Sequence, residues 1–355
     1  MQIIDLRSDT VTKPTLKMRQ AMKEAEVGDD GFGEDPTTNR FEKMAAEKLG
    51  KEDALLVSSG VMGNLIAIMV HTKPGDGLIC DRKAHINTMA SGNTAALTGV
   101  TICPLDVDEL GRFDTEEIES YINLEDVRFP KTSMIVLENT NNLAGGTVVT
   151  PEETSIVFKI ARKNGLRLHL DGARIFNSAI AQGVGVTELT KDCDSVMFCI
   201  SKGLASPVGS IIAGTKEFIV EARRKRKMLG GSMRQTGVLA TCGIISLEEM
   251  IDRLKEDHDS ARYLAEGLAR IEGFNINLDT VQTNIVYFKF ELPKVSCKKF
   301  VKDISKKGVY MVYLERDSGR MVTHKDLNKS DIDCALETIK KTVSGYQVDI
   351  LKNVM

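Results

Sequence analysis

Two residues at the ends of apolar segments carry the clearest chemistry in this chain. Lys202 follows the apolar segment 196–200, and Asp171 follows a second such segment, residues 166–170. A desolvated lysine forms an imine with an aldehyde, and a carboxylate beside a pyridine nitrogen keeps that nitrogen protonated. Together they indicate the protein side of pyridoxal-phosphate (PLP) chemistry, with Lys202 as the Schiff-base lysine and Asp171 as the partner of the ring nitrogen.

A small-residue turn offers a place for the phosphate. Ser58, Ser59 and Gly60 separate the apolar segment 54–57 from a predicted helix over residues 65–70. The start of a helix presents free backbone N–H groups and the positive end of the helix dipole, which suit a phosphate. The turn is neither a GxGxxG nor a GxxxxGK motif, so it does not favour a nucleotide.

Each of these features has a simpler explanation when it is taken alone. Asp171 could cap a helix, Lys202 could be solvated, and Arg174 could form a surface ion pair. What favours PLP is the order of the phosphate turn, the aspartate and the lysine, each at the end of an apolar segment. Ligands of open α/β sheets bind at the edge where such segments end.

The apolar segments predict the sheet that would position these residues. Five of them alternate with helical patterns, at residues 54–57, 77–80, 134–137, 166–170 and 196–200. That alternation is typical of a mostly parallel α/β sheet. A sixth segment, 209–213, follows Lys202 after a turn too short for a crossover helix, so we expect it to run antiparallel to its predecessor.

A chain of 355 residues is long enough for a large and a small domain. We expect a PLP-binding large domain with an N-terminal arm at residues 1–245 and a smaller α+β domain at residues 246–355. The predicted elements near and beyond this boundary are a helix at 216–229, a long polar helix at 246–271, short strands at 284–290 and 309–312, and a helix at 330–343.

Composition excludes some classes of partner. The net charge is −3, with 47 basic and 50 acidic residues, which does not favour binding to nucleic acid or to an anionic membrane. The basic run 223–227 is interpreted as a solvated helix face. Seven scattered cysteines without a CxxC pair, no signal-like N-terminus and no membrane span predict a soluble, cytoplasmic protein that acts on small molecules. We predict no metal ligands.

Nine stretches spread over nearly the whole chain carry a specific resemblance. They are LRSDTVT (6–12), VGDD (27–30), GEDPT (33–37), ENT (138–140), DGARIFN (171–177), SKGL (201–204), PVGS (207–210), GGSMRQ (230–235) and VTH (322–324). With them the chain resembles the low-specificity L-threonine aldolases, members of the β-eliminating lyase group of PLP fold type I. The resemblance implies an aspartate aminotransferase-like fold and a homodimer or homotetramer with shared active sites. It also implies PLP-dependent cleavage of the Cα–Cβ bond of a β-hydroxy-α-amino acid to glycine and an aldehyde.

The resemblance assigns roles around the cofactor. It implies Lys202 as the imine lysine, Asp171 at the pyridine nitrogen, and His85 as a catalytic residue stacked on the ring. The phosphate contacts that it implies are Ser59, Gly60 and Val61.

Further implied roles concern charged and polar side chains. Ser8, Arg174 and Arg320 would surround the substrate carboxylate, and Arg174 could also reach the phenolic oxygen of the cofactor. Arg234 would reach the phosphate bound by the neighbouring subunit.

Four positions depart from the family pattern. The family usually has a histidine at the position of Asn141, a glutamate at Ala90, a tyrosine at Phe32 and a threonine at Val61. Asn141 is still predicted to contact the substrate, and His85 or a water held by Asn141 is left to act as the base on the β-hydroxyl. We therefore hypothesise that the side-chain specificity has shifted toward a bulkier or less polar substrate, or that the retro-aldol activity is poor.

Three alternatives stay open. The same fold and cofactor could support β-elimination, racemisation or transamination. A PLP-binding protein with little catalysis is a second alternative, which Lys202, Asp171 and Arg320 disfavour. A nicotinamide-dependent oxidoreductase is the third, and it lacks its glycine fingerprint here.

Overall fold

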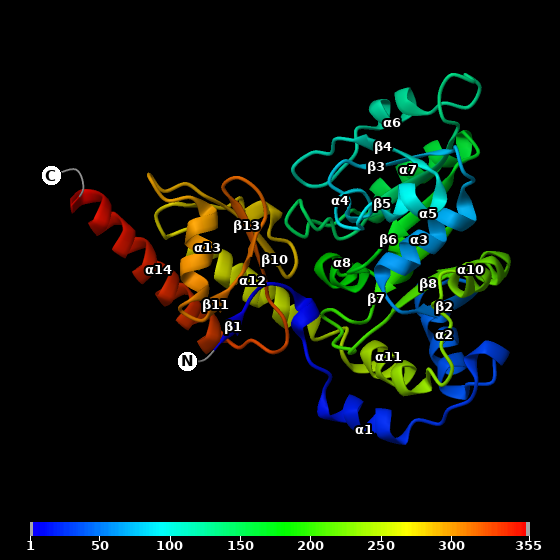
Figure 1. Cartoon of the computed structure of the whole chain (residues 1–355), viewed down its shortest axis with the longest axis horizontal. Helices are drawn as coiled ribbons and strands as arrows, with labels where there is room; N and C mark the ends of the chain where they lie inside the picture. Colours follow the sequence, from blue (N-terminus) through cyan, green and yellow to red (C-terminus); the bar gives the residue numbers. More distant parts are fainter. Residues whose placement is uncertain (1–2, 353–355) are drawn as a thin grey trace.

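A seven-stranded sheet organises the larger part of the molecule (Figure 1). The computed structural model describes residues 3–352, with side chains to residue 348. In spatial order the strands are β2 (Asp53–Val57), β8 (Ser210–Gly214), β7 (Ser195–Cys199), β6 (Arg167–Asp171), β5 (Thr132–Glu138), β3 (Gly77–Asp81) and β4 (Thr101–Leu105). β8 runs antiparallel to both of its neighbours, and the other pairs are parallel. The predicted α/β class and the antiparallel strand after Lys202 are confirmed.

The edge strand β4 was not predicted from the sequence. Only Leu105 of its five residues is buried, and Thr101 is exposed. The strand also contains Pro104, which lacks the N–H that a central strand needs and is tolerated at an edge. A half-exposed strand with a proline therefore has no apolar run to reveal it.

Helices cover both faces of this sheet, because successive strand residues point to opposite faces. On one face, Leu56 packs in an apolar core with helices that include α2 (Pro36–Leu49). On the opposite face, Leu55 packs in another core with α3 (Gly60–His71) and α10 (Lys216–Met228). Among residues 3–352, no helix has the length and apolar character needed to cross a membrane. The helices of this part are α1 (Leu16–Glu24), α2 (Pro36–Leu49), α3 (Gly60–His71), α4 (His85–Thr88), α5 (Asn93–Thr98), α6 (Thr115–Tyr121), α7 (Pro151–Lys163), α8 (Ile175–Gln182), α9 (Val186–Thr190), α10 (Lys216–Met228) and α11 (Gly237–Glu249), with the short 3₁₀ turns η1 (Asp9–Val11) and η2 (Asp30–Phe32).

A separate core forms around a small antiparallel sheet, away from the two cores of the large sheet, and is called the second core below. Its strand order is β12 (Val312–Tyr313), β13 (Ser318–Val322), β10 (Ile285–Phe290), β9 (Phe274–Asn275). The surrounding elements are α12 (Leu254–Leu268), the 3₁₀ turn η3 (Leu278–Thr280), α13 (Cys297–Ser305) and α14 (Lys329–Lys352). The predicted strand near 284–290 and the helix near 330–343 are confirmed, whereas the strand predicted at 309–312 is divided into β11 (Val309–Tyr310) and β12, which belong to different sheets.

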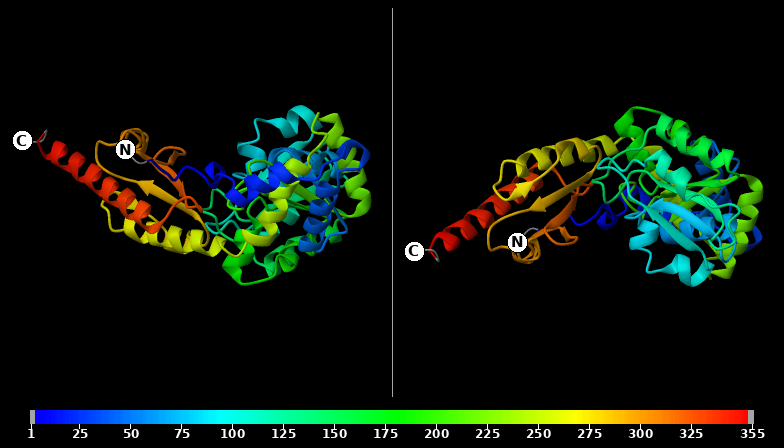
Figure 2. Two further views of the ribbon diagram at one scale, coloured as in Figure 1. Left: turned by 90° about the horizontal axis from the view of Figure 1, so that it is seen from below. Right: turned by 90° about the horizontal axis from the view of Figure 1, so that it is seen from above.

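The N-terminal residues belong to this second core. Strand β1 (Ile4–Asp5) pairs in parallel with β11 (Val309–Tyr310), and the views of Figure 2 place the N-terminal strand beside the small sheet. Leu6 is fully buried there. The chain therefore starts in the second core and then crosses to the large sheet.

The predicted long helix at 246–271 is wrong. Two helices occupy this region, α11 and α12, with a break at residues 250–253. Met250 packs in the core of the large sheet, whereas Ala261 packs in the second core. The break lets the two helices pack in different cores. The proposed domain boundary between residues 245 and 246 falls inside α11 and stays a prediction.

Replacement of Leu6 tests the contribution of the N-terminal strand to the second core. We expect Leu6→Ala to lower the free energy of unfolding by about 2–5 kcal/mol, because it removes a fully buried side chain. Ile156, an isomeric side chain that is 46% exposed, provides the control, and Ile156→Ala is expected to change stability by about 0.5 kcal/mol or less. Equilibrium urea unfolding measures both, and equal losses would contradict this role of Leu6.

Candidate active site

A cavity of about 270 Å³ opens at the carboxyl ends of the central strands. It gathers most of the residues that the sequence predicted for the site. Those that line it are Ser8, Ser59, Gly60, Val61, His85, Asp171, Arg174, Lys202 and Arg320. Residues far apart in the chain thus meet at the edge of the sheet that the sequence indicated.

Asp171 is the last residue of β6 and is buried in the cavity wall. The side-chain amide of Asn64 donates a hydrogen bond of 2.6 Å to its Oδ2, and the backbone N–H of Ala173 donates one of 3.1 Å to its Oδ1. These two donors hold the carboxylate in a fixed orientation. Such a carboxylate suits a protonated pyridine nitrogen.

The start of α3 forms another wall. Ser59 caps this helix and accepts a hydrogen bond from the backbone N–H of Met62, which leaves the first N–H groups of the helix for a ligand. A Cβ atom at Gly60 would lie 2.8 Å from the Sγ atom of Cys199, so only glycine brings the helix start this close to β7. The turn fits a phosphate group.

Lys202 lies in the turn between β7 and β8 and lines the cavity. Its carbonyl oxygen accepts a hydrogen bond of 2.9 Å from the hydroxyl of Thr12, which also donates to the carbonyl of Asp9. The N-terminal turn η1 is therefore fastened to the backbone of the lysine.

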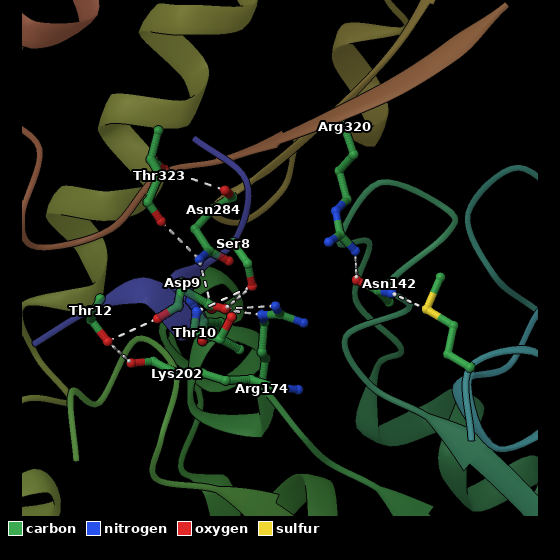
Figure 3. A network of polar contacts seen from close by, with 12 residues as sticks. Ser8, Asp9, Thr10, Thr12, Asn142, Arg174, Lys202, Asn284, Arg320 and Thr323 are labelled. Atoms are coloured by element: carbon green, nitrogen blue, oxygen red, sulfur yellow. Dashed lines mark hydrogen bonds and ion pairs between the residues drawn. The ribbon is translucent and has the colours of Figure 1, made fainter. Parts of the chain in front are cut away.

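A buried ion pair joins this turn to the sheet edge (Figure 3). Arg174 Nε and Nη2 each donate to one oxygen of Asp9 at 2.7 Å, and Asn284 Nδ2 donates to the same carboxylate at 3.2 Å. Burial alone raises the pKa of Asp9, but the guanidinium of Arg174, the charge of Lys202 and these hydrogen bonds bring it well below its usual value. The sequence missed this pairing, which uses two of the nitrogens of Arg174.

Arg320 reaches the cavity from β13 of the small sheet (Figure 3). Its Nη1 donates a 2.6 Å hydrogen bond to Asn142 Oδ1, and its buried Nε has no hydrogen-bond partner among the described residues. Burial and the nearby charge of Arg174 lower its pKa to about 10, so it stays a cation at neutral pH. A buried cation with spare donors suits a substrate carboxylate.

Glu138 connects His85 with the loop that holds Asn142. Its carboxylate accepts the backbone N–H of His85 at 2.7 Å and that of Asn142 at 2.8 Å. Burial and the charge of Asp171 raise the pKa of Glu138 to about 7. Burial lowers the pKa of His85; the charge of Asp171 opposes this shift, and the cations Lys202, Arg174 and Arg320 add to it. The imidazole is therefore neutral at pH 7 and can accept a proton.

Several residues of the cavity were missed from the sequence, namely Asn64, Glu138, Thr140 and Asn142. One signal was available for Glu138, which ends the apolar segment 134–137 as Asp171 ends its own. The hydroxyl of Thr140 is buried and has no hydrogen-bond partner in the described part of the chain. It faces a site that a ligand could complete.

Two predicted residues lie outside the cavity. Asn141 donates a hydrogen bond of 3.0 Å to Asp81 Oδ2 and lines a neighbouring cavity of about 550 Å³. The side chain of Arg234 is 66% exposed and lies 3.6 Å from the carboxylate of Asp29. The predicted contacts of Asn141 with the substrate and of Arg234 with a neighbouring phosphate stay predictions.

The other departures from the family pattern also have distinct surroundings. Ala90 is buried, Phe32 is 78% exposed, and Val61 lines the cavity as a half-exposed side chain. An alanine and a valine place apolar groups where the family carries ionisable or polar ones.

Comparisons with known proteins find that the chain is similar to β-eliminating lyases. The family model for β-eliminating lyases matches residues 5–291. Low-specificity L-threonine aldolase 1 of Arabidopsis thaliana is 41% identical over 351 residues, which cover 98% of each chain. The low specificity L-threonine aldolase of Escherichia coli K12 is 42% identical over 75% of this chain and 79% of its own. A solved threonine aldolase of Leishmania major shares the fold, with a TM-score of 0.82, 18% identity and coverage of 96% and 99%.

The Asp9–Arg174 pair leads to a stability prediction. We expect Asp9→Asn to lower the free energy of unfolding by about 3–5 kcal/mol, because it leaves the buried cation of Arg174 without its carboxylate. The solvent-accessible pair of the half-buried Asp5 and the exposed Arg7 gives the control, and Asp5→Asn should cost at most about 1 kcal/mol.

The same pair predicts how stability depends on pH. The pKa of Asp9 is lowered in the folded protein, so its contribution is complete above the unfolded value near 3.8 and is lost as the pH falls below it. Urea unfolding between pH 3 and pH 7 should therefore show a difference between Asp9→Asn and the wild type that shrinks with acid. A constant difference would contradict the assignment.

Proposed function

The chain belongs to the β-eliminating lyase family, and from this we propose that it is a PLP-dependent aldolase that cleaves L-threonine or L-allo-threonine to glycine and an aldehyde. The observation that carries the proposal is one cavity in which Lys202, the buried carboxylate of Asp171 and the incompletely paired Arg320 meet. When bound, PLP supplies a sink for the electrons that are released when a bond to Cα breaks.

Each residue of the cavity would have a separate role in binding the cofactor. Lys202 would hold the aldehyde carbon of the cofactor, and the negative charge of Asp171 would keep the proton on its pyridine nitrogen. The N–H groups at the start of α3, around Gly60 and Val61, would bind the phosphate. Together these residues would hold the cofactor at both ends of its ring.

The substrate would be oriented by its carboxylate. Arg320 provides the cation, and Ser8 and Arg174 lie in the same wall. Holding the carboxylate at these residues would orient the substrate so that its Cα–Cβ bond is presented to the cofactor, which would supply the electron sink when that bond breaks. The neutral His85 would then accept the proton of the β-hydroxyl.

A shifted substrate preference is the second candidate. Asn141 is held by Asp81 outside the cavity, and Ala90 offers no ionisable group. Both observations favour a β-hydroxy amino acid with a bulkier or less polar side chain than threonine. β-Elimination, racemisation and transamination share the cofactor and are separated from cleavage by their products.

We further propose that the enzyme is a soluble, cytoplasmic homodimer or homotetramer whose sites are shared between subunits. Exposed apolar side chains at the cavity support an oligomer, among them Val61 and Met89. Scattered unpaired cysteines support a reducing compartment.

Product analysis tests the reaction. Purified protein with PLP and L-threonine should release glycine and acetaldehyde, and Lys202→Ala should reduce that rate by roughly 10²- to 10⁴-fold, the range for loss of one catalytic group. Lys191, which pairs with Glu188 on the surface, gives a control whose alanine variant should keep the wild-type rate. A keto acid and ammonia in place of glycine would identify an elimination, and glycine only from bulkier substrates would favour the second candidate.

Mixed oligomers test the sharing of sites. If Arg234 serves the neighbouring subunit, a protomer with Lys202→Ala and one with Arg234→Ala together form one intact site. Random mixing of the two impaired variants should then restore about a quarter of wild-type activity, since half the dimers are mixed and each has one intact site. No gain above the average of the separate variants would assign Arg234 to its own subunit.

A further inference from the structure

A chain of buried polar side chains runs behind Asp171, away from the cavity. Asn64 Nδ2 donates to Asp171 Oδ2 at 2.6 Å, and Asn64 Oδ1 lies 3.0 Å from His169 Nε2. His169 Nδ1 lies 2.8 Å from Ser195 Oγ, and this oxygen lies 2.8 Å from His71 Nε2. We call Asn64, His169, Ser195 and His71 the polar seam.

The fold explains why these residues meet. His169 and Asp171 are two residues apart on β6 and share one face, and His169 is the register partner of Ser195 on β7. Asn64 and His71 are two helical turns apart on α3, about 10 Å along its axis. The polar seam therefore lies between α3 and the two central strands.

The hydrogen bonds of the polar seam have one direction. A carboxylate only accepts, so the Asn64 amide donates to Asp171 and its oxygen accepts from His169 Nε2–H. The Nδ1 of a neutral His169 then accepts from the Ser195 hydroxyl, whose oxygen accepts from His71 Nε2–H. Every donor points toward Asp171, and hydrogen bonds aligned in this way strengthen one another.

This direction of the hydrogen bonds requires that His169 and His71 are both neutral. Burial lowers the pKa of His71 to about 4 and that of His169 to about 3, so both are neutral at physiological pH. Around His71, Asp194 acts to raise its pKa and Arg167 to lower it. The ring of His71 stacks on Phe218 with centroids 4.8 Å apart, which fixes its orientation.

Stability alone does not explain these residues. Buried polar groups gain little net stability over apolar groups of the same shape, and each must be satisfied. The polar seam leads to a residue of the proposed cofactor site through Asn64, which lines the cavity. Beyond Asn64, it consists of side chains that the proposed reaction does not use.

We propose that the polar seam is a positioning device for the pyridine nitrogen of PLP: it fixes the carboxylate of Asp171 in place, and so strengthens binding of the ring through its nitrogen. The inference rests on the proposed function, because it requires the ring nitrogen to lie at Asp171. The members of the polar seam are positioning residues, since they act through Asp171.

Ser195→Ala tests the polar seam by interrupting it behind His169, at the third hydrogen bond from Asp171. Ser210 supplies a matched control, because it is also a fully buried serine, lies on the adjacent strand β8, and has a hydroxyl without a partner among the described residues. The measurement is an absorbance titration of the apo forms of the full chain with PLP and with 1-deazapyridoxal phosphate, which has a carbon in place of the ring nitrogen.

We expect a loss of affinity that affects PLP and not the deaza compound. Ser195→Ala should weaken PLP binding by about tenfold, the size of one net hydrogen bond, whereas Ser210→Ala should bind like the wild type. For the deaza compound, Ser195→Ala and the wild type should have the same Kd. A merely structural role of Ser195 would weaken both ligands equally, and that result would overturn the proposal.

Other outcomes are equally decisive. Unchanged PLP binding by a folded Ser195→Ala would also overturn the proposal. If that variant does not fold, His71→Phe replaces it, because phenylalanine can keep the stacking on Phe218 and removes the last donor of the polar seam. Wild-type protein that binds neither compound would overturn the proposed function itself, and the role of the polar seam with it.

Discussion

The buried ion pair between Asp9 and Arg174 is the interaction on which the arrangement of the site depends. Taking both charges out of water is costly, and the two-pronged geometry together with the amide of Asn284 compensates for that cost. The three residues come from the N-terminal turn, the edge of the large sheet and the region of the small sheet. The ion pair and Asn284 thus join three distant parts of the chain around one cavity.

The parallel strands bring the other ionisable groups of the site together at their carboxyl ends. Glu138 and Asp171 end neighbouring strands in register, so two carboxyl groups lie at the same edge. Asn64 donates to one of them, and backbone N–H groups of two loops donate to the other. Because their environments differ, the two carboxyl groups can have different roles. Enzymes commonly assign acid and base roles to similar residues in this way. Here Asp171 faces the proposed cofactor, and Glu138 holds the loops that carry His85 and Asn142.

Much of this could be predicted from the sequence because buried strands have a strong signal. The segments ending at Asp171 and Lys202 are apolar throughout, and their order alone implied a shared edge. The half-exposed strand β4 and the break between α11 and α12 could not be found in this way. Strand β4 contains Pro104, and the helix break at residues 250–253 contains neither glycine nor proline, so both depend on tertiary packing.

Side-chain partners were harder to predict than strands. The sequence indicated Arg174 without its partner Asp9, since a pairing across 165 residues leaves no local pattern. It also pointed to Asn141, while the adjacent Asn142 lines the cavity and binds Arg320. A one-residue difference in a loop decides which side chain faces a ligand, and backbone direction in a loop has no simple sequence signal. The substrate side of the site is therefore where the prediction was weakest.

The central claim is that Lys202 carries the cofactor. Borohydride reduction of the protein saturated with PLP, followed by digestion and peptide mass mapping, tests it most directly. The account predicts a phosphopyridoxyl group on the peptide that contains Lys202. Labelling of a different lysine, or no specific labelling, would contradict it.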